Sequence, residues 1–125
     1  MQASANEPPV DLRQPLIEIV IESWRLAKLT LRVLGKFEAS EANRYLNQVR
    51  YFQKRVDDTL SLLGMHLVSL EGLPYDPGMA VTALNIADFG PDENLVVDQV
   101  MEPILMGPDG IVKSGTVLLR QEVRP

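Results

Sequence analysis

The chain has no cysteine and only one histidine, His66. Without cysteine, it cannot form disulfides, thiolate metal sites or cysteine nucleophiles. One histidine cannot supply a multi-histidine metal site, and a Ser-His-Asp triad could be built only around His66. Because His66 stands between apolar neighbours in an expected strand, we interpret it as a structural or surface residue. We therefore expect no enzyme activity, no catalytic residues, no metal site and no cofactor.

Long apolar runs are also missing from the chain. Charged residues such as Glu18, Glu22 and Arg25 interrupt the most apolar segment, so no stretch reaches the roughly 18 to 20 apolar residues that a membrane span requires. Residues 1–9 lack the basic region and apolar core of a secretory signal. We expect a cytoplasmic protein with no membrane partner, and we predict that residues 1–9 form a disordered tail.

Positive charge is scarce in the second part of the sequence. Residues 1–72 contain nine Lys or Arg and nine Asp or Glu, whereas residues 73–125 contain three and eight, which accounts for the net charge of −5. An acidic half repels phosphate backbones and lacks the basic stripe that nucleic-acid binding needs. We expect no nucleic-acid partner.

No motif for a small-molecule substrate is present either. Gly107, Gly110 and Gly115 do not form a nucleotide-binding loop, and no helix follows them to accept a phosphate. Residues 88–90 spell the Asp-Phe-Gly of protein kinases, but the other kinase sequences are absent, so the match is fortuitous. The sequence predicts a protein that acts by binding another protein.

What the sequence does contain is a pair of helical patterns in residues 10–64. Apolar residues of the first pattern recur at alternating spacings of three and four, at Ile17, Val20, Trp24, Ala27, Leu31 and Leu34. The second pattern repeats these spacings at Ala42, Tyr45, Val49, Phe52, Val56, Thr59 and Leu63. Pro15 suits a first helical turn, Ser40 an N-cap, and Gly35 and Gly64 helix ends. This pattern predicts an αα-hairpin.

Both helices carry further apolar residues outside these seams: Leu16, Ile19, Ile21, Leu26, Leu29, Val33, Leu46, Leu60 and Leu62. Packing the two helices together would bury only part of this surface, so we predict a homodimer in which two hairpins form a four-helix bundle. The predicted interface contains Ile17, Val20, Trp24, Leu31, Val49, Phe52 and Val56. Alternatively, the extra residues pack on the C-terminal half of the same chain.

Residues 65–125 are rich in turn residues and short apolar runs. Candidate strands cover residues 65–70, 81–89, 95–106, 111–112 and 116–123, with turns at residues 72–78, 90–94 and 107–110. We predict a small antiparallel β-domain. The fold class is therefore α+β, with a helical dimerisation region followed by a β-domain.

The order of these elements, together with two short motifs, resembles GrpE, the nucleotide-exchange factor of DnaK-type chaperones. Leu63-Gly64 followed by Tyr75-Asp76-Pro77 matches one family motif, and residues 111–119 match a C-terminal strand with Lys113 at the position of the family's Arg. The sequence departs from the family at residues 78–81, which replace a His-Glu pair, and at Gly107-Pro108, which replaces a Gly-Tyr step. We expect a divergent, shortened relative without the long N-terminal stalk.

The resemblance implies a co-chaperone of protein folding and the stress response that binds the nucleotide-binding domain of a DnaK-type chaperone and favours ADP release. It implies that Val112, Lys113 and Val117 contact the chaperone, and that Tyr75, Asp76 and Pro77 fix the corner between the two halves. An alternative is a GrpE-shaped dimeric scaffold or regulator that no longer binds a chaperone and uses its acidic half on a basic partner.

Overall fold

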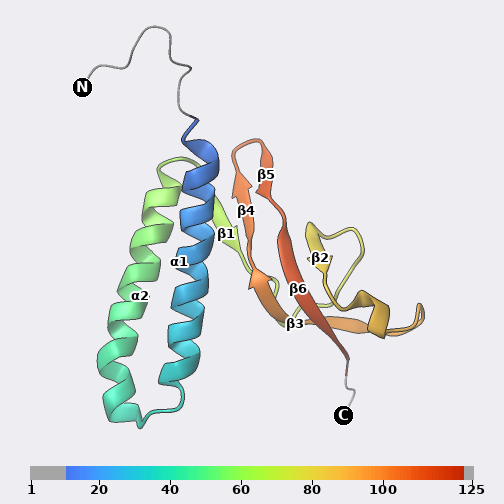
Figure 1. Cartoon of the computed structure of the whole chain (residues 1–125), viewed down its shortest axis with the longest axis horizontal. Coiled ribbons are helices and arrows are strands. Elements are labelled where there is room, and N and C mark those ends of the chain that lie inside the picture. The colour runs from blue at the N-terminus through green and yellow to red at the C-terminus, as the bar shows by residue number, and fades with distance from the viewer. Residues whose placement is uncertain (1–10, 123–125) are drawn as a thin grey trace, which may run out of the picture.

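A computed structural model describes residues 11–122, which form two helices followed by short strands in two small sheets. Helix α1 spans Arg13–Leu34 and helix α2 spans Ala39–Ser61, and they form the predicted hairpin (Figure 1). Helix α1 begins two residues before Pro15, where the Asp11 carboxylate accepts a hydrogen bond from the backbone N–H of Arg13 at 2.9 Å. The predicted tail, residues 1–9, lies outside the described residues.

The two ends of α2 show one error and one success of the sequence patterns. Ser40 was expected to cap α2, but the N-cap is Glu38, whose extended backbone turns its carbonyl toward the N–H groups of Glu41 and Ala42. Ser40 therefore lies in the first turn. After α2, Gly64 adopts a φ of +69°, which favours glycine, and a Cβ there would lie 2.8 Å from Pro108.

The first sheet lies beside the hairpin. It contains β1 (His66–Val68), β4 (Ile104–Gly107) and β5 (Gly110–Lys113), in the order β1-β4-β5, and both pairings are antiparallel. The predicted turn at residues 107–110 connects β4 to β5. This sheet is the part of the β-module, residues 65–122, that lies next to α1 (Figure 1).

The second sheet lies farther from the helices and is mixed. It contains β2 (Val81–Ala83), β3 (Leu95–Glu102) and β6 (Gly115–Gln121), in the order β2-β6-β3. The prediction of a wholly antiparallel β-module is wrong, because β2 pairs with β6 in parallel. The long connection between these strands leaves their relative direction open at the level of sequence.

Three predicted strands are shorter than expected, and the one predicted at residues 65–70 is limited to β1. The strand predicted at residues 81–89 ends at Ala83, because the Asn85 side chain replaces the backbone as the hydrogen-bond partner of Leu119 on β6. The Asn85 side-chain amide donates to the Leu119 carbonyl at 2.9 Å and accepts from the Leu119 N–H at 2.8 Å. A 3-10 helix, Ile86–Asp88, follows. The run at residues 95–106 is divided by the buried Pro103, which has no N–H for a strand ladder and marks the crossing from β3 to β4.

Two separate cores hold these elements together. The first core joins both helices to the first sheet through Ile17, Val20, Ile21, Leu60 and Leu105. The second core lies on the second sheet and contains Val97, Val117 and Leu119. The first core therefore joins the hairpin to the first sheet, and α1 also contacts β3 of the second sheet.

The alternative packing of the extra apolar residues is thus realised in part. Ile21 and Leu60 lie outside the helical seams and belong to the first core. Six of the other residues are exposed on α1 or just after α2: Leu16, Ile19, Leu26, Leu29, Val33 and Leu62. The fold of one chain leaves most of this apolar surface uncovered.

Candidate interaction surfaces

The side of the hairpin that points away from the β-module is apolar and exposed. Five large side chains define this outward hairpin face: Leu16, Ile19 and Leu26 on α1, Phe52 on α2 and Leu63 just after it, with exposed fractions from 41% to 64%. Ile19 and the core residue Ile21 are two positions apart, about 200° around a helix, so they point to nearly opposite sides.

The outward hairpin face contains two shallow hollows between the helices, of about 260 and 240 Å³. Phe52 lines both of them, and we refer to the two hollows together as the groove. Ile19 and Leu63 line the first hollow, and Leu26 lines the second. A groove between two helices with apolar walls is a suitable receptor for an apolar helix surface.

The residues predicted for the dimer interface have different positions in the fold. Ile17 and Val20 are each only 6% exposed and belong to the first core, so packing within one chain already uses them. Val56 packs against the same core, whereas Phe52 is exposed in the groove. Three more are half-buried: Trp24, Leu31 and Val49. The residues predicted for the dimer interface thus pack mainly within one chain, and residues beside them form most of the outward hairpin face.

A second candidate surface lies on the β-module around Lys113. The Lys113 amine lies 3.2 Å from a carboxylate oxygen of Glu102, and its side chain is 30% exposed. Val112, next to it, is half-buried against the first core. Val117 is fully buried in the second core, so its side chain cannot contact a partner, and we leave it out of the contact surface. Of these three predicted contacts, only Lys113 presents a charged group to solvent.

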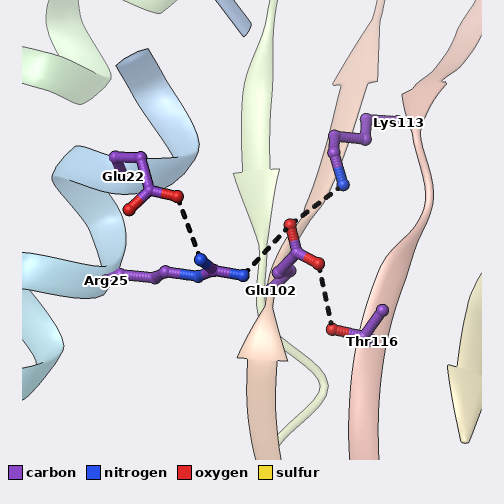
Figure 2. Close-up of polar contacts among 5 residues, drawn as sticks. All are labelled: Glu22, Arg25, Glu102, Lys113 and Thr116. Carbon is purple, nitrogen blue, oxygen red and sulfur yellow. Dashed lines mark hydrogen bonds and ion pairs between the residues drawn. The ribbon is translucent and has the colours of Figure 1, made fainter. Parts of the chain in front are cut away.

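Glu102 is the centre of a polar cluster that the sequence analysis missed (Figure 2). Besides Lys113, its carboxylate lies 3.5 Å from the Arg25 guanidinium of α1 and accepts a hydrogen bond from the Thr116 hydroxyl at 3.4 Å. Arg25 also pairs with Glu22 at 2.9 Å. We name these five residues the Glu102 cluster. Its members come from three distant parts of the sequence, and apart from the i, i+3 spacing of Glu22 and Arg25 no local spacing signals their contact.

The predicted corner residues lie on the second sheet. The Tyr75 side chain packs against the second core, and its N–H donates to the Leu95 carbonyl at 2.8 Å. The Asp76 carboxylate accepts from the N–H of Gly78 at 3.0 Å, which closes an Asx-type turn. This segment therefore holds the loop after β1 against the edge of β3, with Pro77 in an exposed turn.

The remaining residues that drew attention in the sequence lie apart from both surfaces. His66 is exposed on β1 opposite Met106, and Asp58 pairs with Lys54 along α2 at 2.8 Å. Within residues 11–122, no group of three or more His, Asp or Glu side chains is arranged to hold a metal ion. In the same range, neither helix has the length and apolar character needed to cross a membrane.

Comparisons of the chain with protein-family models, with curated proteins and with solved structures found no match.

Proposed function

We propose that this protein is a GrpE-like nucleotide-exchange factor that binds the nucleotide-binding domain of a DnaK-type chaperone as a homodimer. The observation that carries the proposal is the division of the fold into two surfaces. One is an apolar groove on a helical hairpin, and the other is a β-module with the partly exposed Lys113 at the motif that resembles the GrpE family. The GrpE-like order of elements in the sequence adds to this support.

The outward hairpin face supports the dimer. Its five large apolar side chains form a continuous exposed surface, which is unusual on a monomer. Full burial of one such side chain contributes about 1.5 to 3 kcal/mol, so covering the groove with a second hairpin supplies several kcal/mol toward association. A two-fold dimer uses the same face on both copies. This suits the outward hairpin face, because the apolar side chains of one copy would fill the apolar groove of the other.

Charges beside the groove indicate how two hairpins would fit. Glu18 is exposed on α1, and Arg55 is exposed on α2 and lines the groove. If α1 of one copy lies over α2 of the other, opposite charges meet at both edges of the interface. This arrangement gives a four-helix bundle with a β-module attached to each hairpin.

The exchange mechanism needs no catalytic residue. The dimer binds the chaperone's nucleotide-binding domain more tightly when its cleft is open, and the open cleft holds ADP weakly. The acceleration of exchange is limited by the ratio of the factor's affinities for the open and the closed cleft. By the same linkage, bound ADP weakens binding of the factor to the chaperone. Lys113 contributes a partly exposed ammonium group that can pair with a carboxylate on the chaperone.

The test is stopped-flow release of fluorescent ADP from a DnaK-type chaperone of the same organism, with increasing amounts of this protein. We expect faster release with the unaltered protein. For Lys113→Gln, we expect the concentration for half-maximal effect to rise roughly five- to tenfold, because a charge contact is lost. Arg120→Gln is the matched control, since Arg120 is a cation of the same β-module that pairs with Asp98 at 3.3 Å. No acceleration by the folded, unaltered protein would refute the proposal.

A second candidate is a dimeric scaffold of the same shape that does not bind a chaperone. The surplus of acidic residues in residues 73–125 and the missing His-Glu pair after Pro77 favour a basic partner. A folded dimer that neither accelerates ADP release nor binds the chaperone, but binds a basic protein in a salt-dependent way, would favour this candidate.

A further inference from the structure

The chain contains two bodies with separate cores. The first body is the hairpin with the first sheet, held by the first core, and the second body is the second sheet with its own core. The chain crosses between them at two neighbouring places, from β3 to β4 at Pro103 and from β5 to β6 at Ser114. A third connection is the segment between β1 and β2. Contacts at the two crossings therefore decide how the bodies sit relative to each other.

Glu102 is the residue at which the two bodies meet. It is the last residue of β3, in the second body, yet its carboxylate lies 3.5 Å from Arg25 of α1 and 3.2 Å from Lys113 of β5, both in the first body. Its third contact, at 3.4 Å, is to Thr116 of β6 in the second body. Figure 2 shows these side chains converging from α1, β5 and β6.

The backbone of Glu102 is held as tightly as its side chain. A Cβ on Gly115, at the neighbouring crossing, would lie 2.7 Å from the Glu102 carbonyl oxygen, so the two crossings are in close contact. The Glu102 side chain is 21% exposed, the least of any acidic partner in the ion pairs of residues 11–122. Ion pairs that are partly shielded from water are weakened less by solvent and salt than exposed ones.

One other ion pair connects α1 to a segment beyond the first sheet, between Lys28 and Glu71. Its atoms are 3.6 Å apart, and the side chains are 37% and 51% exposed. Glu71 lies in a loop rather than in a strand of either sheet. This pair is therefore a weaker restraint on the second sheet than the Glu102 cluster.

We propose that Glu102 is a positioning residue that fixes the orientation of the second sheet relative to the hairpin and first sheet, and thereby relative to Lys113 of β5, the proposed partner contact. The structural part is a property of the free protein. The consequence for the partner rests on the proposed function: a chaperone domain bound at Lys113, in the first body, meets the second sheet at a defined angle only if the two bodies keep a fixed orientation.

The test measures distances between spin labels by pulsed electron resonance, and the absence of cysteine allows clean labelling. Labels at exposed Arg44 of α2 and Thr82 of β2 report on the two bodies. Labels at Arg44 and at exposed His66 of β1 report within the first body and serve as the internal control. Labelled protein is diluted with unlabelled protein so that distances within one chain dominate.

Glu102→Gln keeps the size of the side chain and removes its charge. We expect loss of the single narrow distance between positions 44 and 82, while the distance between positions 44 and 66 stays unchanged. Asp98→Asn is the matched control, because Asp98 pairs with Arg120 within the second sheet. Arg25 is half-exposed and lies outside the first core, so Arg25→Gln should fold. It should also lose the narrow distance between positions 44 and 82, and it replaces Glu102→Gln as the test if that variant does not fold.

A narrow, unchanged distance between positions 44 and 82 in Glu102→Gln, or in Arg25→Gln if the first variant does not fold, would overturn the proposal. A broadened distance between positions 44 and 82 in Asp98→Asn would also overturn the proposal, because the loss of any carboxylate charge would then loosen the two bodies. If the unaltered protein accelerates ADP release, the variant that broadens the distance should lower the acceleration about two- to fivefold, the effect of losing one ion pair. If the variant accelerates ADP release as much as the protein without substitutions, the consequence for the partner is refuted. If the protein without substitutions does not accelerate ADP release, only the proposed function is refuted.

Discussion

At the scale of single residues, Gly115 has the most restricted position. It is the first residue of β6, where the chain passes from the first sheet to the second, and a Cβ there would come within 2.7 Å of the Glu102 carbonyl oxygen and 3.3 Å of the Ile104 nitrogen. Both atoms belong to the backbone and cannot turn aside as a side chain does. This chain therefore brings its two crossings closer together than a Cβ allows.

Gly115→Ala should destabilise the protein by about 1 to 3 kcal/mol, the usual cost of forcing extra volume into a packed site. Urea unfolding followed by circular dichroism measures this difference. Gly90→Ala is the control, because no atom lies within 4 Å of a Cβ at that position. If both substitutions lower the free energy of unfolding equally, the close approach at Gly115 does not contribute to the stability of the protein.

At the scale of an element, helix α1 has two apolar sides with different roles. Ile21 is 2% exposed and packs in the first core, whereas Ile19 is 64% exposed on the outward hairpin face. The two residues have the same chemistry and nearly the same place along the helix. They differ only in the side of α1 on which they lie, which makes them a matched pair for separating folding from association.

Ile19→Asp should give a folded monomer, because a charge on the outward hairpin face opposes burial against a second copy. Ile21→Asp should not fold, because an unpaired charge in the first core costs several kcal/mol. Sedimentation equilibrium gives the mass and circular dichroism gives the melting temperature. A monomeric unaltered protein, or an Ile19→Asp variant that stays dimeric, would contradict the proposed interface.

At the scale of the whole molecule, the first core makes the hairpin and the first sheet one unit. Leu105 of β4 is fully buried against helix residues, although it is 45 positions from Leu60, the nearest helical residue of the first core in the sequence. Neither helix alone encloses this core. The helices should therefore lose their packing when the first sheet is weakened.

Leu105→Ala should destabilise the protein by about 2 to 5 kcal/mol, as large-to-small changes at buried leucines do. The fluorescence of Trp24, the single tryptophan, reports on the hairpin. We expect its urea midpoint to move down together with the midpoint measured by circular dichroism. A Trp24 transition that stays in place would show that the hairpin folds independently of the sheet, contrary to the structure of the first core.

The sequence by itself determined the local features of this protein. The three-four spacing of residues such as Val20 and Phe52 predicts both helices, because helix periodicity is a property of the local chain. Gly64 and the turn at residues 107–110 were predicted for the same reason, since they depend on short-range backbone preferences. The two-helix hairpin followed by short strands was thus predictable.

Only the tertiary structure decided which side of each element is covered and which distant residues meet. It placed Ile17 and Val20 in a core within one chain, turned β2 parallel to β6, and buried Val117. It also brought Glu102 to Arg25, a contact between residues far apart in the sequence. The physical reason is that periodicity identifies an apolar side but not its partner, because several partners satisfy the same hydrophobic pattern and only the packing of the whole chain selects among them.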